Sequence, residues 1–190
     1  LFYTILDNVD DTRIESNWPF LAVVRILGIV VALFSLTMLL PLGFAFFGDD
    51  PALSAYDESI LITAVSGIII ATLTWWHRRE LYSRDGFLLV ALVWLVLPVF
   101  AALPFLRYFP DITFTQAYFE AASGLSTTGA TILTGLDDLP PSILLWRAFL
   151  QWLGGMGILI LALAILPLLG VGGMQIYRAE MPGPIKDSKL

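Results

Sequence analysis

The chain has 190 residues, of which 58% are hydrophobic and only 14% are charged, a composition typical of proteins that lie mainly within a membrane rather than of soluble globular domains. It contains no cysteine and a single histidine, which excludes disulfides, thiolate metal sites and histidine metal clusters. The net charge of −6 comes from scattered acidic residues, and no basic patch indicates a nucleic acid as a partner.

The first segment, residues 1–19, is expected to be a cytoplasmic lead-in. It carries several acidic residues and lacks the basic start and short apolar core of a secretory signal. The chain begins with Leu1 rather than with methionine, which is typical of a trimmed, tagged or fragmentary sequence.

Four apolar runs are long enough to cross a membrane. A hydrocarbon core of about 30 Å requires roughly 20 mostly apolar residues in a helix. The runs that meet this requirement are residues 20–47, 59–76, 86–106 and 142–177. The sequence therefore predicts an all-α, multi-pass membrane protein, in which residues 20–76 form two leading transmembrane helices.

The distribution of basic residues predicts the orientation, because Lys and Arg are enriched on the cytoplasmic side of a membrane. With the N-terminus inside, eight of the ten Lys and Arg residues are cytoplasmic, and only Arg107 and Arg147 lie outside. Residues 178–190 then form a second cytoplasmic segment. Trp75 and Trp76 lie at the inner end of the second helix, as interfacial aromatic anchors do.

The first outer loop, residues 48–58, is acidic and has no basic residue. Its carboxylates are Asp49, Asp50, Asp57 and Glu58. An acidic outer face would concentrate cations near the protein. The same residues also occur in ordinary solvated loops, and the sequence leaves both interpretations open.

Between the third and fourth spans lies a helix that is too short to cross. Asp111 or Thr113 can cap its start, apolar residues recur at helical spacing, and Ser123-Gly124 can end it. A helix over residues 113–124 is only about 18 Å long, so the chain must turn back within the membrane. Irregular backbone is tolerated there only where it is buried in protein or lines a water-filled path, and residues 126–131 are therefore predicted to line a pore.

The returning residues have the chemistry of a K⁺ site. Thr127 and Thr128 offer carbonyl and hydroxyl oxygens, and Gly129 can adopt the positive φ that aims successive carbonyls at one axis. A row of such oxygens can replace the water shell of K⁺. Thr127, Thr128, Gly129 and Ala130 are the candidate ion-binding residues, with K⁺ as the transported ion and no organic cofactor on this chain.

A carboxylate lies inside the short helix, where an unpaired charge is costly. We expect Glu120 to pair with a structural partner, with Arg147 as the candidate, rather than to bind the ion directly. In the fourth span, Gly154, Gly155 and Gly157 are expected to permit close helix packing rather than to form a gating hinge.

These segments follow the M1-P-M2 order of potassium-selective pores: M1 (86–106), pore helix (113–124), filter (126–131) and M2 (142–177). Residues 119–131 and 150–157 resemble the first filter loop and the following helix of the Trk/Ktr family of potassium transporters, and most closely its TrkH-type membrane subunits. Residues 83–87 and 165–184 are also similar to the family. The resemblance extends over nearly the whole chain from about Phe20 onward, and residues 1–19 depart from it.

The resemblance implies a subunit with two leading helices and four M1-P-M2 repeats around one pore, of which this chain holds the first. Gly129 would be the filter glycine. A serine at this place accompanies sodium permeation in related plant transporters, so glycine favours K⁺. Family members are usually homodimers in the bacterial inner membrane, regulated by a cytosolic ring of TrkA-like nucleotide-binding subunits. The remaining pore repeats of the same subunit would complete the filter; tetramerisation is the alternative.

Two other functions remain open at this stage. One is a non-conducting membrane subunit for assembly or anchoring, and the other is a proton-coupled cation carrier, for which Glu120 is the only candidate relay within the membrane. An enzyme is not expected, because the sequence has neither a phosphate-binding loop nor a credible set of nucleophile and base.

Overall fold

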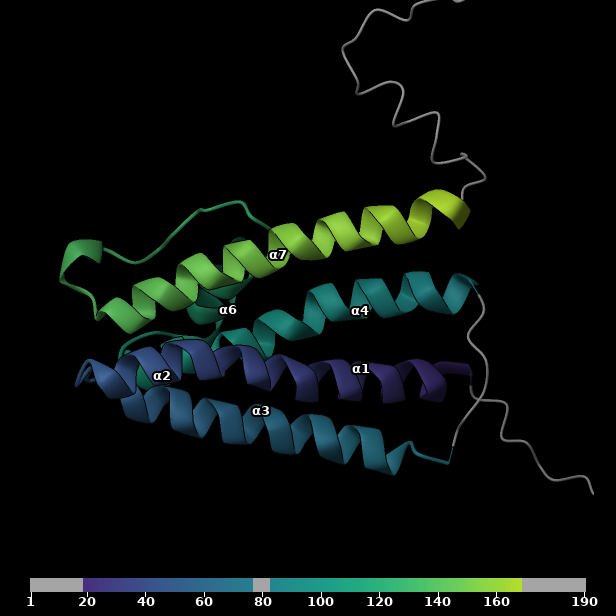
Figure 1. Ribbon diagram of the computed structural model, residues 1–190, viewed down its shortest axis with the longest axis horizontal. Helices are drawn as coiled ribbons and strands as arrows, with labels where there is room; N and C mark the ends of the chain where they lie inside the picture. The colour runs from purple at the N-terminus through teal and green to yellow at the C-terminus, as the bar shows by residue number, and fades with distance from the viewer. Residues whose placement is uncertain (1–18, 77–82, 169–190) are drawn as a thin grey trace, which may run out of the picture.

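The computed structural model describes residues 19–76 and 83–168, and within these ranges every regular element is a helix. Four helical stretches are long and apolar enough to cross a membrane: Phe20–Phe47, Leu53–Leu73, Arg84–Tyr108 and Pro141–Ile160. Figure 1 shows them running side by side along the long axis of the molecule. The predicted all-α, multi-pass fold is confirmed.

Some predictions concern residues outside the described ranges. They include the cytoplasmic segments at both ends, most of the basic loop between the second and third spans, and the last part of the fourth span.

The first span is one continuous helical path with a short irregularity. It consists of α1 (Pro19–Ser35), the 3-10 turn η1 (Leu36–Met38) and α2 (Leu39–Phe47). The hydroxyls of Ser35 and Thr37 donate to main-chain carbonyls three residues earlier, at 2.7 and 2.6 Å. Such bonds compete with the regular helical pattern, which explains why the helix tightens here without ending.

The second span, α3 (Leu53–Leu73), packs closely against α1. It begins six residues earlier than predicted, so the end of the acidic loop belongs to its first turns. A Cβ atom on Gly28 would lie 2.7 Å from the amide nitrogen of Ala71, and one on Gly67 would overlap the amide nitrogen of Ala32. The two glycines therefore allow the backbones of α1 and α3 to touch.

The third span is divided into two helices, α4 (Ser83–Ala101) and α5 (Leu103–Tyr108). The sequence predicts one helix over residues 86–106 that the prolines kink or end. Pro98 lies inside α4, and Pro104 lies in the first turn of α5, where the missing amide hydrogen leaves no helical bond unmade. The break at Ala102 follows from this spacing.

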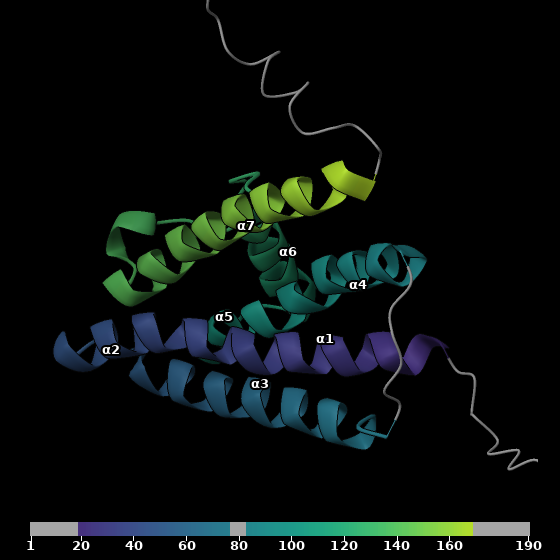
Figure 2. The same ribbon diagram turned by 45° about the vertical axis from the view of Figure 1, so that its right-hand side comes forward.

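The short helix α6 (Phe114–Leu125) is enclosed by the third and fourth spans. Figure 2 shows α6 between α4 and α7 (Pro141–Leu168), well inside the ends of the bundle. Trp146 of α7 is fully buried, and its ring nitrogen donates to the carbonyl oxygen of Ala101 at 3.1 Å. The indole contacts α4, and its ring centre lies 6.0 Å from that of Phe34 of α1, with the two planes tilted by 56°. It therefore joins the repeat to the leading helices.

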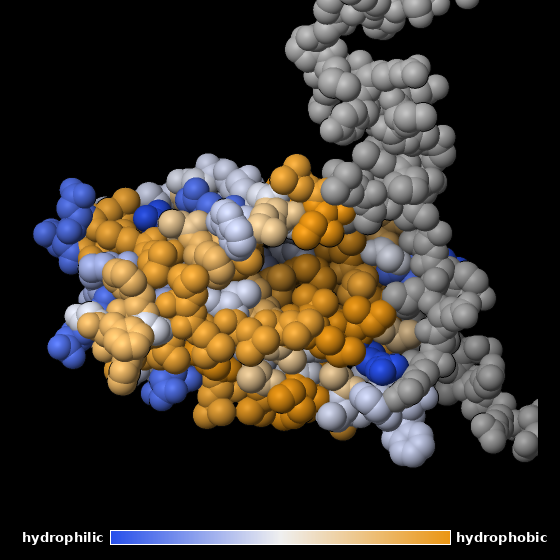
Figure 3. All heavy atoms as spheres, viewed as in Figure 1, coloured by the Kyte–Doolittle hydropathy of each residue, from blue (hydrophilic) through white to orange (hydrophobic). Residues whose placement is uncertain are grey.

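The outer surface of the bundle suits a lipid environment. Many large aliphatic and aromatic side chains are exposed. Figure 3 shows hydrophobic residues covering the middle of one face, with hydrophilic residues gathered towards the ends. A soluble protein rarely exposes so continuous an apolar surface.

Candidate functional site

The short helix α6 begins with a well-defined cap. The hydroxyl of Thr113 accepts a hydrogen bond from the amide of Gln116 at 3.3 Å, and the Gln116 side chain accepts one from the amide of Thr113 at 2.9 Å. This reciprocal arrangement satisfies two of the amides that a helix start leaves unbonded. Of the two predicted caps, Thr113 is the one the structure uses.

The chain reverses directly after α6, and the returning residues bond to the end of that helix through their amides. The amide of Thr127 donates to the carbonyl of Gly124 at 2.9 Å. The amides of Thr128 and Gly129 donate to the carbonyl of Ser123 at 3.0 and 3.4 Å. Within the described part of the chain, the carbonyl oxygens of residues 127–129 accept no hydrogen bond.

Two of the returning residues adopt positive φ angles. Gly129 has a φ of 74°, as the sequence predicts for this glycine, and Thr127 has a φ of 57°. The sequence gives no sign of the second, because threonine rarely adopts this conformation. Thr127 and Gly129, on either side of Thr128, therefore share a left-handed backbone conformation, which turns this irregular segment sharply.

The candidate ion-binding residues divide into two groups. Thr127, Thr128 and Gly129 are exposed and keep their carbonyl oxygens unbonded. The carbonyl of Ala130 instead accepts a hydrogen bond from the hydroxyl of Ser123 at 2.7 Å. Ser123, which the sequence marks only as a helix stop, thus bonds to the returning residues at three points. Of the two groups, Thr127, Thr128 and Gly129 have the better geometry for a cation.

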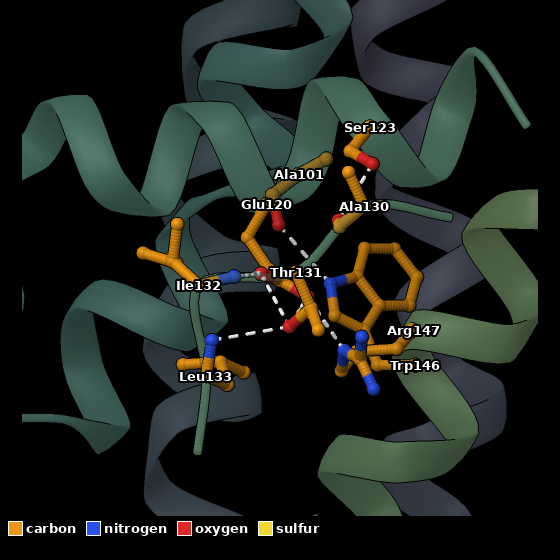
Figure 4. A network of polar contacts seen from close by, with 9 residues as sticks. All are labelled: Ala101, Glu120, Ser123, Ala130, Thr131, Ile132, Leu133, Trp146 and Arg147. Carbon is orange, nitrogen blue, oxygen red and sulfur yellow. Dashed lines mark hydrogen bonds and ion pairs between the residues drawn. The ribbon is translucent and has the colours of Figure 1, made fainter. Parts of the chain in front are cut away.

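Glu120 ties the returning strand to both neighbouring helices. Its carboxylate, 2% exposed, accepts from Nε of Arg147 at 2.7 Å, from the hydroxyl of Thr131 at 3.0 Å and from the amide of Ile132 at 3.0 Å (Figure 4). The predicted pairing of Glu120 with Arg147 is confirmed. The carboxylate acts here as a structural support behind the strand.

One glycine of the fourth span permits close contact with the end of α6. A Cβ atom on Gly154 would overlap the carbonyl oxygen of Leu125. At Gly155 the nearest atom is a methyl carbon of Thr127, at 3.9 Å, and at Gly157 nothing lies within 4 Å. Of the three glycines predicted to allow packing, only Gly154 has this role among the described residues.

Within the described residues, two of the four carboxylates in the acidic segment after α2 have partners in the fold. Asp50 is 8% exposed and accepts hydrogen bonds from the amides of Ala52 at 2.8 Å and Ser142 at 3.0 Å. It therefore caps the start of α7. Glu58 forms an exposed ion pair with Arg107 at 3.2 Å. Neither Asp50 nor Glu58 is therefore a purely solvated carboxylate.

Replacing Asp50 by alanine is expected to lower the free energy of unfolding by about 1–3 kcal/mol, because two buried amides lose their acceptor. Asp57→Ala removes an exposed carboxylate in the first turns of α3 and is the matched control. Thermal unfolding of the purified natural protein measures both. Equal midpoints for the two variants would contradict the capping role of Asp50.

Comparison with known proteins agrees with this architecture. Residues 57–190 match the family described as "TrkH: Cation transport protein". The chain is 53% identical over 176 residues to the Trk system potassium uptake protein TrkH of Salmonella typhimurium, and 52% identical to the protein of the same name from Escherichia coli strain K12. Each match covers 90% of this chain and 36% of the relative, so the chain spans about a third of the length of these curated relatives.

A solved structure has the same fold. The potassium transporter TrkH from Vibrio parahaemolyticus superposes with a TM-score of 0.74 at 48% sequence identity, over 81% of this chain and 33% of that one. The family is one of transport proteins and not of enzymes. The chain belongs to the TrkH family of cation transport proteins.

Proposed function

We propose that this chain supplies the first of four filter loops in the pore subunit of a potassium uptake system. K⁺ would pass the carbonyl oxygens of Thr127, Thr128 and Gly129. Ala130 is the fourth residue of the candidate set. The observation that carries this proposal is the short strand after α6, whose amides are bonded to the helix while three successive carbonyls are not. The names of the relatives, potassium uptake proteins of the Trk system, agree with it.

Unbonded carbonyls are costly at membrane depth. Lipid cannot donate hydrogen bonds, and each unsatisfied backbone group costs several kcal/mol there. A strand with exposed, unbonded carbonyls is stable only next to water or a cation. One strand provides part of an oxygen cage, and the greater length of the relatives is consistent with further repeats that would complete it.

The same geometry argues against a proton-coupled carrier. Glu120, its only candidate relay, already accepts from Arg147 and from two groups of the returning strand. A carboxylate held by three donors of the fold serves as a structural support, whereas a relay needs a path by which protons reach and leave it.

We also propose a membrane, an orientation and partners for this subunit. The protein lies in the bacterial inner membrane with its N-terminus in the cytoplasm, which agrees with eight of ten basic residues on that side. It works as a homodimer with a cytosolic ring of TrkA-like nucleotide-binding subunits. Membership of the Trk system among the relatives supports a multi-component transporter.

Substitution of Gly129 by serine tests the filter assignment. A Cβ atom at this position meets nothing within 4 Å, so any effect arises from the φ of 74° rather than from a clash. The left-handed conformation costs a non-glycine residue roughly 1–2 kcal/mol. We expect the preference for K⁺ over Na⁺ to fall about tenfold, in line with that energy.

The measurement is Rb⁺ and Na⁺ uptake by the natural protein in potassium-starved, transport-deficient cells. Gly129→Ala is the control that separates backbone strain from the added hydroxyl, and it should lose selectivity to a similar extent. An unchanged K⁺/Na⁺ preference in both variants would contradict the filter assignment. No uptake by the unaltered protein would favour the assembly or anchoring role.

A further inference from the structure

Arg25 lies at the boundary of the membrane rather than inside it. The helix α3 is about 32 Å long, close to the hydrocarbon thickness of about 30 Å. Gly28 of α1 lies beside Ala71 near the end of α3, so Arg25, about one turn earlier in α1, is level with the end of α3. The stretch from Arg25 to Phe47 is about 33 Å long, and the guanidinium group is thus at the depth of the lipid headgroups.

The guanidinium group of Arg25 has no acidic partner among the described residues. Its central carbon lies 4.9 Å from the centre of the Trp75 ring, and its Nε is buried with no hydrogen-bond acceptor. No described carboxylate forms an ion pair with it. A guanidinium at headgroup depth without a counterion keeps its positive charge available to an anionic ligand.

The surroundings of Arg25 have the properties of a lipid-facing surface. Trp75 is 51% exposed and Trp76 is 90% exposed, as in the aromatic belts at membrane interfaces. Another cation, Arg84 at the start of α4, has a side chain that is 75% exposed. Figure 1 shows the start of α1, the end of α3 and the start of α4 at the same end of the molecule.

We propose that Arg25, whose guanidinium lies over the ring of Trp75, binds the phosphate of an anionic phospholipid in the leaflet at this end of the bundle. The planar guanidinium carries several donors that match phosphate oxygens. Because Nε is buried, the phosphate would be met by the two terminal nitrogens. The exposed tryptophans beside it favour a lipid as the occupant over another protein surface. Basic sites between transmembrane helices bind anionic headgroups in this way.

Lipid retention by the purified natural protein tests this site. The protein is equilibrated with vesicles of phosphatidylglycerol or of phosphatidylcholine, and the retained lipids are counted by native mass spectrometry. The unaltered protein is expected to retain more phosphatidylglycerol than phosphatidylcholine. In Arg25→Gln the ratio of the two retained lipids is expected to fall about fivefold. Arg84→Gln, which removes an exposed cation at the same end, is expected to keep most of it. Equal losses in the two variants would show only a general effect of positive charge and would overturn the site.

A second pair of variants decides the question if Arg25→Gln does not fold. Trp75→Leu removes the ring beneath the guanidinium, and Trp76→Leu removes its more exposed neighbour. Loss of the phosphatidylglycerol preference in the first variant alone supports the proposal, and the same behaviour in both contradicts it.

Inorganic phosphate is then added to the unaltered protein. Displacement of phosphatidylglycerol by phosphate would identify a free-anion site and overturn the assignment to lipid, and its absence supports a headgroup site.

Discussion

Replacing Glu120 by glutamine is expected to lower the free energy of unfolding of the natural protein by about 3–5 kcal/mol, because it leaves the charge of Arg147 partly buried and unpaired. The Arg147 side chain is 16% exposed and that of Glu120 is 2% exposed, so water compensates little for the lost partner. The returning strand also loses the carboxylate that accepts from Thr131 and Ile132. Thermal unfolding measures the first effect, and uptake of Rb⁺ by the folded fraction measures the second.

The exposed ion pair of this chain provides the control for Glu120. Glu58→Gln breaks the pair with Arg107, whose two side chains are about half exposed, and such pairs contribute only about 0–1 kcal/mol. A double substitution, Glu120→Gln with Arg147→Gln, is expected to cost less than the sum of the two single changes, because no unpaired charge remains. Additive costs would show that the two residues act separately.

Replacing Gly154 by alanine is expected to push α7 away from the end of α6. The added methyl group would overlap the carbonyl oxygen of Leu125, a main-chain atom that no change of rotamer can move. Overpacking of this kind costs about 1–3 kcal/mol. Because Leu125 directly precedes the returning strand, we also expect lower uptake of K⁺ or Rb⁺ per folded molecule.

The same helix contains the matched control for Gly154. Gly157→Ala adds a methyl group where nothing lies within 4 Å, and alanine is favoured over glycine within a helix by about 1 kcal/mol. The two substitutions should therefore change the unfolding temperature in opposite directions. A Gly154→Ala protein as stable and as active as the Gly157→Ala protein would contradict the close contact between α6 and α7.

Much of this architecture can be predicted from the sequence alone. The four spans follow from hydropathy over a window of fixed length, and the helix α6 follows from being too short to cross. A cap at Asp111 or Thr113 and the pairing of Glu120 with Arg147 are also predictable, because a helix start needs an acceptor and a charge within the membrane needs a partner. The structure selects Thr113 as the cap. Each of these features depends on a local sequence pattern, or on an unpaired charge or unbonded group for which the chain offers few partners.

The tertiary structure alone decides which groups meet across the chain. Asp50 accepts from the amide of Ser142, 92 positions later, although the sequence shows only one acid among four in a loop. Likewise, Ser123 holds the carbonyl of Ala130, and Gly154, unlike its neighbours, touches another backbone. Hydropathy fixes how many times the chain crosses the membrane, but the rotation and separation of the packed helices fix which side chains face each other, and these depend on contacts made by the whole bundle.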